Sequence, residues 1–246
     1  MCHNQNQGEH MNRKIPFVTR DQMKAIDRLM AVQYHIGLIQ MMENAGLRLA
    51  ELTRKIMGGS VEGRSILAVC GSGNNGGGGM VAARHLHNWG ARMTIKINKS
   101  SSDMKIVPKR QLSILRALNL RFIENINDQN YEVILDAVMG YGADGNPRGE
   151  AGQWIQIMNE SKKLILSLDS PSGLDVTTGK PGKPCVKAYA TLTLALPKTG
   201  FQSDGAKPFI GQLYLADIGI PRELINQLGI VGENIFVEKP IIKIES

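Results

Sequence analysis

Cysteine is scarce in this sequence, with only three copies in 246 residues. Cys2, Cys70 and Cys185 cannot all pair with one another, and Cys70 ends an apolar run, where a buried thiol is expected. A disulfide scaffold is therefore excluded, and the cysteine usage favours a reducing compartment such as the cytoplasm. The sequence also lacks a cluster of cysteine and histidine with the spacing of a zinc site.

Long apolar segments are missing as well. No uninterrupted apolar run approaches the roughly 20 residues of a membrane-spanning helix, and the opening MCHNQNQGEHMNRK lacks the apolar core of a secretory signal. We expect residues 1–14 to form a flexible tail and residues 15–246 to form a single domain. These features favour a cytoplasmic protein with no membrane partner.

The excess of positive charge is moderate. The chain has 29 basic and 22 acidic side chains, which gives a net charge of +7. Such a charge favours anionic partners in general. It does not distinguish a nucleotide from a nucleic acid or a membrane surface.

The secondary-structure signals alternate along the chain. Thr19 and Gln22 form a capping box that predicts a helix to about residue 30, and a second helix is predicted over 38–56. Strands are predicted at 65–70, 93–97, 121–124, 133–136, 164–169, 190–196 and 213–217. Further helices are predicted at 80–89, 105–118, 153–161 and 221–228. This alternation indicates an α/β fold with a mostly parallel sheet covered on both faces. Ligands of such sheets bind at the carboxyl ends of the strands, where the strand order reverses.

A glycine-rich loop, residues 71–79, leaves the strand 65–70 and precedes a predicted helix. Glycine allows the backbone to approach a ligand closely, and the start of a helix attracts phosphate. The second strand ends without the acidic residue that an ordinary dinucleotide fold uses for the ribose, so hydride transfer from NAD is disfavoured. A glycine-rich turn without a ligand is the alternative.

Two carboxylates end neighbouring predicted strands. Asp136 and Asp169 are expected at the same edge of the sheet as Asn75, with Ser172 close by. Oxygen ligands of this kind suit a hard cation, which could also help to hold an anionic substrate. Asp136 could instead only cap its own loop. Lys198, at the end of another apolar strand, is either a contact to a substrate phosphate or a solvated surface lysine.

Several motifs together resemble one family. They are Met42-Glu43-Asn44-Ala45-Gly46, Gly73-Asn74-Asn75-Gly76-Gly77, Asp136-Ala137, and Asp169 with Pro171-Ser172-Gly173-Leu174-Asp175. In this order they resemble the NAD(P)H-hydrate epimerase family, also called the YjeF N-terminal domain. The resemblance implies a three-layer α/β/α sandwich of Rossmann type and a homodimer. It also implies interconversion of the R and S forms of NADHX and NADPHX, which are nicotinamide cofactors hydrated at ring carbon 6. An S-specific dehydratase then acts on the S form.

The resemblance also implies the site residues. Potassium would be held by Asn75, Asp136 and Ser172. Asp169 is the expected catalytic acid and base, because a partly desolvated carboxylate can have a suitable pKa. The expected substrate-binding residues are Asn74, Asn75, Gly76, Gly77, Gly78, Gly140, Tyr141, Gly142, Ala143, Asp144, Gly145, Asn146 and Asp169.

The sequence departs from the family pattern at Gly78, where the family's loop usually has an aspartate at the start of the following helix. Tyr141 also stands where threonine is common. A second hypothesis therefore stays open, namely a catalytically impaired module of the same fold that binds a nucleotide or RNA. Its basic surface would consist of Lys96, Lys99, Lys105, Lys109 and Arg110. A solvated charged face is the alternative for this set, and it has no interleaved aromatic residues for stacking.

Overall fold

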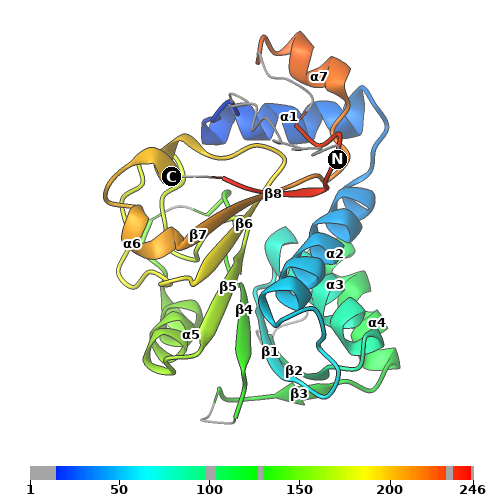
Figure 1. Cartoon of the computed structure of the whole chain (residues 1–246), viewed down its shortest axis with the longest axis vertical. Coiled ribbons are helices and arrows are strands. Elements are labelled where there is room, and N and C mark those ends of the chain that lie inside the picture. Colours follow the sequence, from blue (N-terminus) through cyan, green and yellow to red (C-terminus); the bar gives the residue numbers. More distant parts are fainter. Residues whose placement is uncertain (1–14, 98–103, 127–129, 144, 231–234, 245–246) are drawn as a thin grey trace, which may run out of the picture.

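An eight-stranded sheet forms the centre of the protein in the computed structural model (Figure 1), which describes residues 15–97, 104–126, 130–143, 145–230 and 235–244. The strand order is β3-β2-β1-β4-β5-β6-β7-β8, and every neighbouring pair is parallel except β7 and β8. The strands are β1 (Ser65–Cys70), β2 (Arg92–Ile97), β3 (Arg121–Ile123), β4 (Val133–Ala137), β5 (Leu164–Leu168), β6 (Ala190–Leu194), β7 (Gln212–Ala216) and β8 (Ile241–Lys243). The predicted tail, residues 1–14, lies outside the described residues.

Helices cover both faces of the sheet, as the sequence predicts. Figure 1 shows α2, α3 and α4 on one side of the sheet and α5 and α6 on the other. The helices are α1 (Arg20–Val32), α2 (Leu38–Ile56), α3 (Asn74–Asn88), α4 (Ile106–Ala117), α5 (Gly149–Glu160), α6 (Lys207–Ile210) and α7 (Arg222–Gln227), with a 3₁₀ helix at Thr199–Gln202. The expected three-layer α/β/α sandwich is therefore confirmed.

The continuous apolar run of β1 follows from this layering. Its side chains alternate between the two faces, so Ile66 and Ala68 join the core under α2–α4, whereas Leu67 and Val69 pack with Trp154 of α5. Because both faces of β1 are buried, apolar and polar residues do not alternate along it, which explains the nearly continuous apolar sequence SILAVC.

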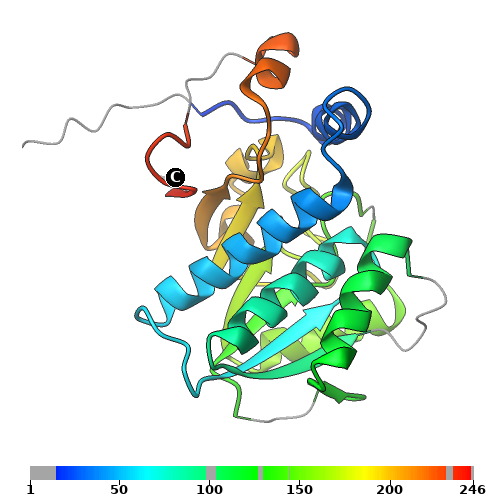
Figure 2. The ribbon, with the colours of Figure 1, turned by 90° about the vertical axis from the view of Figure 1, so that its right-hand side faces the viewer.

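The first two helices form as predicted. Thr19 Oγ1 accepts a hydrogen bond from Gln22 N at 3.2 Å, and Gln22 Oε1 accepts one from Thr19 N at 2.8 Å, which completes the capping box of α1. α2 has the predicted bounds and lies beside α3 (Figure 2). In the described part of the chain, no helix combines the length and the apolar character needed to cross a bilayer.

Two local predictions differ from the structure. The helix predicted at 80–89 begins earlier, at Asn74, so most of the glycine-rich segment is helical. The sequence analysis also missed β8, which pairs antiparallel with β7 through only three residues. Such a short apolar segment gives no periodic signal, and the pairing with β7 determines its conformation.

The strand order positions the ligand-binding edge. β1 lies between β2 and β4, so the chain leaves β1 toward one side of the sheet and leaves β4 toward the other. The loops that follow these two strands diverge, and a crevice opens between them at the carboxyl ends of the strands.

Candidate active site

A cavity of about 660 Å³ lies at this edge of the sheet. Loops that follow β1, β4, β5, β6 and β7 contribute its sheet side, and α1 and α2 contribute apolar side chains that include Met23, Met41 and Met42. The volume is in the range of pockets that hold small molecules and cofactors. The cavity therefore combines one apolar wall with one polar wall.

The amino-terminal end of α3 belongs to the polar wall. Gly73 is the N-cap, and Asn74 and Asn75 line the cavity directly after it. The first N–H groups of a helix have no partner within the helix, and they carry its positive partial charge. This end of α3 can therefore bind an anionic group.

The glycines of this segment sit inside α3, where they allow close packing. A Cβ on Gly76 would lie 1.9 Å from the backbone oxygen of Gly71, and a Cβ on Gly79 would lie 2.4 Å from the Cβ of Ala137. Gly76 and Gly77 are buried within the helix. The glycine run thus brings α3 close to its neighbours, and the segment is helical from Asn74 rather than a loop.

Gly78 is the fifth residue of α3 and lines the cavity. The N-cap is Gly73, so Gly78 lies one turn beyond the helix start at which the sequence places it. The backbone of Gly78 is helical, and a Cβ there would lie 2.7 Å from Cδ2 of Leu168. A larger residue would therefore displace the end of a flexible side chain without straining the backbone.

Asp136, at the end of β4, is fully buried and surrounded by hydrogen-bond donors. Its Oδ1 accepts bonds from Ser172 Oγ at 2.5 Å and Val138 N at 3.3 Å. Its Oδ2 accepts bonds from Ser167 Oγ at 2.7 Å and Ser172 N at 2.9 Å. Burial raises the pKa of Asp136, while the hydrogen bonds from Ser172, Ser167 and Val138 oppose that shift. Asp136 thus fastens the loop after β5 to β4.

Asn75 packs against the loop that follows β4. A Cβ on Gly140 would lie 3.1 Å from both Cβ and Cγ of Asn75. The Asn75 Nδ2 atom is buried and has no hydrogen-bond partner among the described residues. Ser172 reaches the same loop, because its Oγ accepts a hydrogen bond from Met139 N at 2.9 Å. Of the three residues expected to hold potassium, Asn75 and Ser172 therefore contact the segment 136–140, and Asp136 belongs to it.

Asp169, at the end of β5, lines the cavity and is only 3% exposed. Its Oδ1 accepts a bond from Lys198 Nζ at 2.5 Å, and its Oδ2 accepts one from Tyr141 N at 3.0 Å. Its backbone is in the left-handed region, with φ of +68°. Aspartate is one of the few residues other than glycine that adopt this conformation with any frequency, and such positions cluster at functional sites.

Lys198 is fully buried, so the prediction of a solvated surface lysine is wrong. Its ammonium group donates to Asp169 Oδ1, to Thr193 Oγ1 at 3.0 Å and to Leu194 O at 3.1 Å. These three bonds use all three ammonium protons. No proton is left for a substrate phosphate, so Lys198 acts on the site through Asp169.

A second carboxylate faces the same cavity from α1. Asp27 lines the cavity, and its Oδ2 accepts a hydrogen bond from the hydroxyl group of Tyr141. Burial raises the pKa of Asp27, and the hydrogen bond from Tyr141 opposes this shift. Burial and the nearby Asp27 raise the pKa of Tyr141, so its hydroxyl is a neutral donor at neutral pH.

The segment after β4 divides between two cavities. Gly140, Tyr141, Gly142 and Ala143 line the large one. A smaller cavity of about 190 Å³ shares Gly140 and Ala143 and is also lined by Gly145 and Asn146, whereas Asp144 lies outside the described residues. Asp136 and Ser172 are fully buried outside both linings.

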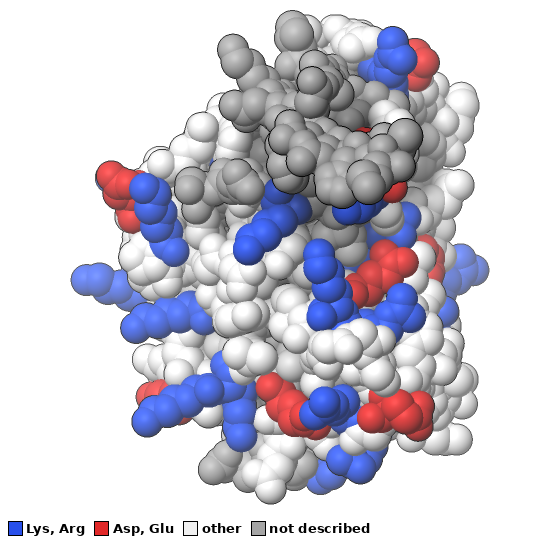
Figure 3. Space-filling view, in the orientation of Figure 1, with Lys and Arg blue, Asp and Glu red and all other residues white. Residues whose placement is uncertain are grey.

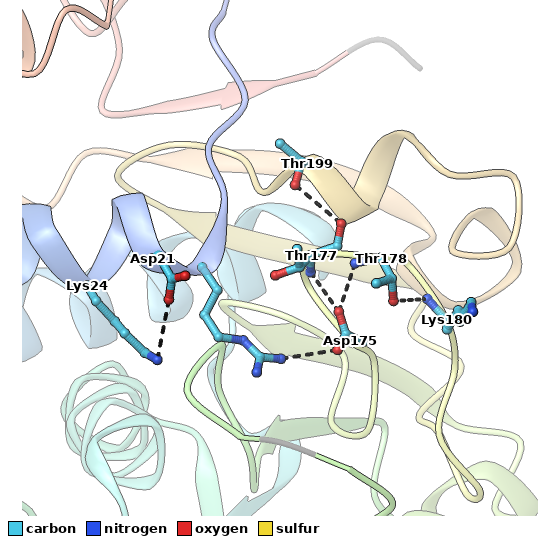
Figure 4. Close-up of polar contacts among 8 residues, drawn as sticks. Asp21, Lys24, Asp175, Thr177, Thr178, Lys180 and Thr199 are labelled. Carbon is cyan, nitrogen blue, oxygen red and sulfur yellow. Dashed lines mark hydrogen bonds and ion pairs between the residues drawn. The ribbon is translucent and has the colours of Figure 1, made fainter.

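Asp175 is a structural turn residue (Figure 4). Its Oδ1 accepts hydrogen bonds from Thr177 N at 2.9 Å and Thr178 N at 2.8 Å, and its Oδ2 accepts one from Arg20 at 3.3 Å. Partial burial raises the pKa of Asp175, but the bonds from Thr178 and Thr177 outweigh it and the pKa is lowered. Asp175 thus stabilises its own turn, and Arg20 ties the start of α1 to this loop.

The basic surface expected for RNA binding is not formed as a set. Lys96 is only 1% exposed; its Nζ donates to Glu124 O at 2.7 Å and lies 4.7 Å from the centre of the Trp154 ring. On the face that Figure 3 shows, basic side chains are dispersed among acidic and uncharged ones. Lys99 lies outside the described residues, and the exposed members are Lys105, Lys109 and Arg110.

Comparison with known families decides the classification. The model of the family described as YjeF-related protein N-terminus matches residues 38–200. The chain belongs to this family. The crystal structure of yeast ynu0 has a TM-score of 0.80 and 23% sequence identity, and the match covers 94% of this chain and all of that one. That likeness shows the same fold.

Three curated relatives of the YjeF-related chain are similar over most of its length. NAD(P)H-hydrate epimerase of Dehalogenimonas lykanthroporepellens is 38% identical, over 87% of this chain and 86% of its own. NAD(P)H-hydrate epimerase of Rhodopirellula baltica is 31% identical, over 88% of this chain and 90% of its own. The bifunctional NAD(P)H-hydrate repair enzyme Nnr of Moorella thermoacetica is 34% identical over 85% of this chain, which spans only 41% of that protein.

The predicted site residues of this YjeF-related chain do not include Asp27, although the sequence carries a signal for it. Met23, Ile26 and Met30 form the buried stripe of α1, and Asp27 lies on the same stripe, four residues after Met23. A carboxylate on an apolar stripe indicates a specific partner. That partner, Tyr141, is 114 residues away, so the sequence alone could not identify it.

Proposed function

We propose that this protein is an NAD(P)H-hydrate epimerase, which interconverts the R and S forms of NADHX and NADPHX. The observation that carries the proposal is the Asp169 carboxylate, which lies on the wall of a cofactor-sized cavity and is held by Lys198 and the Tyr141 backbone. The names of the curated relatives from Dehalogenimonas lykanthroporepellens and Rhodopirellula baltica support it.

The chemistry needs an acid and a base near the hydrated ring carbon. The hydroxyl-bearing carbon is bonded to the ring nitrogen, whose electron pair can expel the protonated hydroxyl as water. Water then adds to either face of the flat cation, which gives both epimers. Asp169 can accept or donate the proton and stabilise the positive charge, and the start of α3 can hold a phosphate of the cofactor.

Potassium is the cation that we propose for this site, and the donor atoms fit it. The carboxylate of Asp136, the hydroxyl group of Ser172 and the amide oxygen of Asn75 are hard oxygen ligands. The buried Nδ2 of Asn75 lacks a partner among the described residues, and rotation of the amide would exchange it for the oxygen. When bound, the ion would supply positive charge beside an anionic substrate.

Other parts of the proposal concern partners and location. We propose a homodimer that works with an S-specific dehydratase. The bifunctional repair enzyme of Moorella thermoacetica, of which this chain spans 41%, supports that functional link. The free, buried thiols of Cys70 and Cys185 suit a reducing compartment, and we propose the cytoplasm.

The test is conversion of purified R-NADHX, coupled to an S-specific dehydratase that consumes the product. Wild-type protein should convert the R form, and Asp169→Ala should lower the rate of conversion by roughly 10²–10⁴-fold. Gly78→Asp should lower KM relative to Gly78→Ala, because both add a Cβ near Leu168 but only Asp adds a carboxylate to the cavity wall. Folded but inactive wild type and Gly78→Asp proteins would contradict the proposal.

A further inference from the structure

Asp27 occupies a position where an apolar residue would be expected. α1 buries Met23, Ile26 and Met30, and Asp27 lies on the same stripe of the helix. A carboxylate taken partly out of water costs free energy unless it is paired. The proposed roles of Asp169 and the cation ligands leave Asp27 without a function.

Tyr141 joins Asp27 to Asp169. The Tyr141 hydroxyl donates to Asp27 Oδ2, and the Tyr141 backbone N–H donates to Asp169 Oδ2 at 3.0 Å. Both carboxylates line the same cavity. No hydrogen bond to another described residue uses Asp27 Oδ1, so this oxygen is available to a molecule in the cavity.

The surroundings of the two carboxylates differ in a way that suits acid–base chemistry. Burial raises the pKa of Asp27, and the hydrogen bond from Tyr141 opposes this shift. The charge of Asp169 raises the pKa further, and the charge of Lys198 lowers it. Asp169 forms an ion pair with Lys198. Neighbouring carboxyl groups with unequal environments commonly divide the roles of acid and base. The other charged groups around the cavity are Lys24 and Arg28 of α1 and Lys105, which precedes α4.

We propose that Asp27 is a second catalytic residue, which donates a proton to the departing hydroxyl while Asp169 accepts a proton from the water that adds. This inference rests on the proposed epimerase function. In the R-to-S direction the C–O bond breaks, its electron pair leaves with the oxygen as water, and the ring nitrogen forms a C=N bond. The incoming water forms the new C–O bond as the π electron pair of the C=N bond returns to the ring nitrogen, and the added water transfers a proton to Asp169. The reverse reaction, or exchange with solvent, restores both protonation states.

The experiment measures kcat and KM for R-NADHX with wild type, Asp27→Asn and Asp21→Asn. Asp21 is a matched control on α1, because its exposed carboxylate pairs with Lys24 at 3.7 Å (Figure 4). Asp27→Asn should lower kcat by ~10²-fold or more with little change in KM, and Asp27→Glu should recover part of the loss. Asp21→Asn should match wild type.

A pH profile of kcat separates catalysis from structure. The hydrogen bond from Tyr141 stabilises the charged form of Asp27, so Tyr141→Phe should move the alkaline limb of the profile to higher pH. If wild type is active and the kcat of Asp27→Asn lies within threefold of the wild-type value, or if only its KM changes, the role of Asp27 is overturned and the epimerase function stands. Inactive wild type would overturn the proposed function and this inference together.

Discussion

The two strand-terminal carboxylates, Asp136 and Asp169, end neighbouring strands but lie in opposite environments. Asp136 is sealed away from the cavities and accepts four hydrogen bonds from nearby hydroxyl and backbone groups. Asp169 lies on the cavity wall and is held by the ammonium group of Lys198. A carboxylate that accepts four hydrogen bonds is suited to shaping loops, whereas one on a cavity wall can exchange a proton with a ligand.

The largest effect is expected where the ion pair of Asp169 is broken. Lys198→Met would leave a buried carboxylate without its cation, which should lower the free energy of unfolding by about 3–5 kcal/mol. The double variant Lys198→Met with Asp169→Asn should recover most of that loss. Urea unfolding at pH 7 measures both, and Lys207→Met, which breaks the exposed pair with Asp204, should leave the midpoint unchanged. A single variant as stable as wild type would show that the pair is not essential.

A smaller effect is expected at Asp136. Asp136→Asn keeps the shape but replaces one acceptor oxygen with an NH₂ donor, so some of the four donors lose their partner at a cost of about 1–3 kcal/mol. Wild type should melt at a higher temperature in potassium than in a bulky organic cation, and Asp136→Asn should lose that difference. Asp217→Asn, at the end of β7, is the control and should keep it. Wild type that melts equally in both salts would contradict the cation site.

The smallest effect concerns Asp27 and has the opposite sign. The pKa of Asp27 in the folded protein is raised above its ordinary value of 3.8, so its stabilising contribution is present below that pH and is lost as the pH rises through the folded pKa. Asp27→Asn should therefore be more stable than wild type at pH 7 by roughly 0.5–2 kcal/mol, at the expense of activity. Urea unfolding should show this gain disappearing toward pH 3.5. A destabilised Asp27→Asn protein at pH 7 would contradict the unfavourable burial of its charge.

Sequence reasoning predicted the features that local chemistry determines. The capping box of Thr19 and Gln22, the apolar run of β1 and the placement of Asp136 and Asp169 at one edge all follow from short segments and from the parallel α/β pattern. The structure confirms each of these.

Side chains that meet only in the folded state could not be predicted in this way. The sequence leaves Lys198 as either a contact to a substrate phosphate or a surface lysine, because its partner Asp169 is 29 residues away. Asp27 meets Tyr141 across 114 residues. The glycine-rich segment follows a strand and precedes a helix, which predicts a loop, but packing makes most of it helical although glycine disfavours helices.

The four consecutive glycines of α3, Gly76 to Gly79, also bear on the order in which the molecule acquires its shape. Each glycine disfavours a helix by about 1 kcal/mol relative to alanine, so the first turns of α3 have little tendency to form by themselves. They gain their stability from contacts with Gly71 and Ala137, which sit at the ends of other segments. The amino-terminal end of α3 should consequently be among the last parts to become ordered during folding, after β1 and β4 have paired.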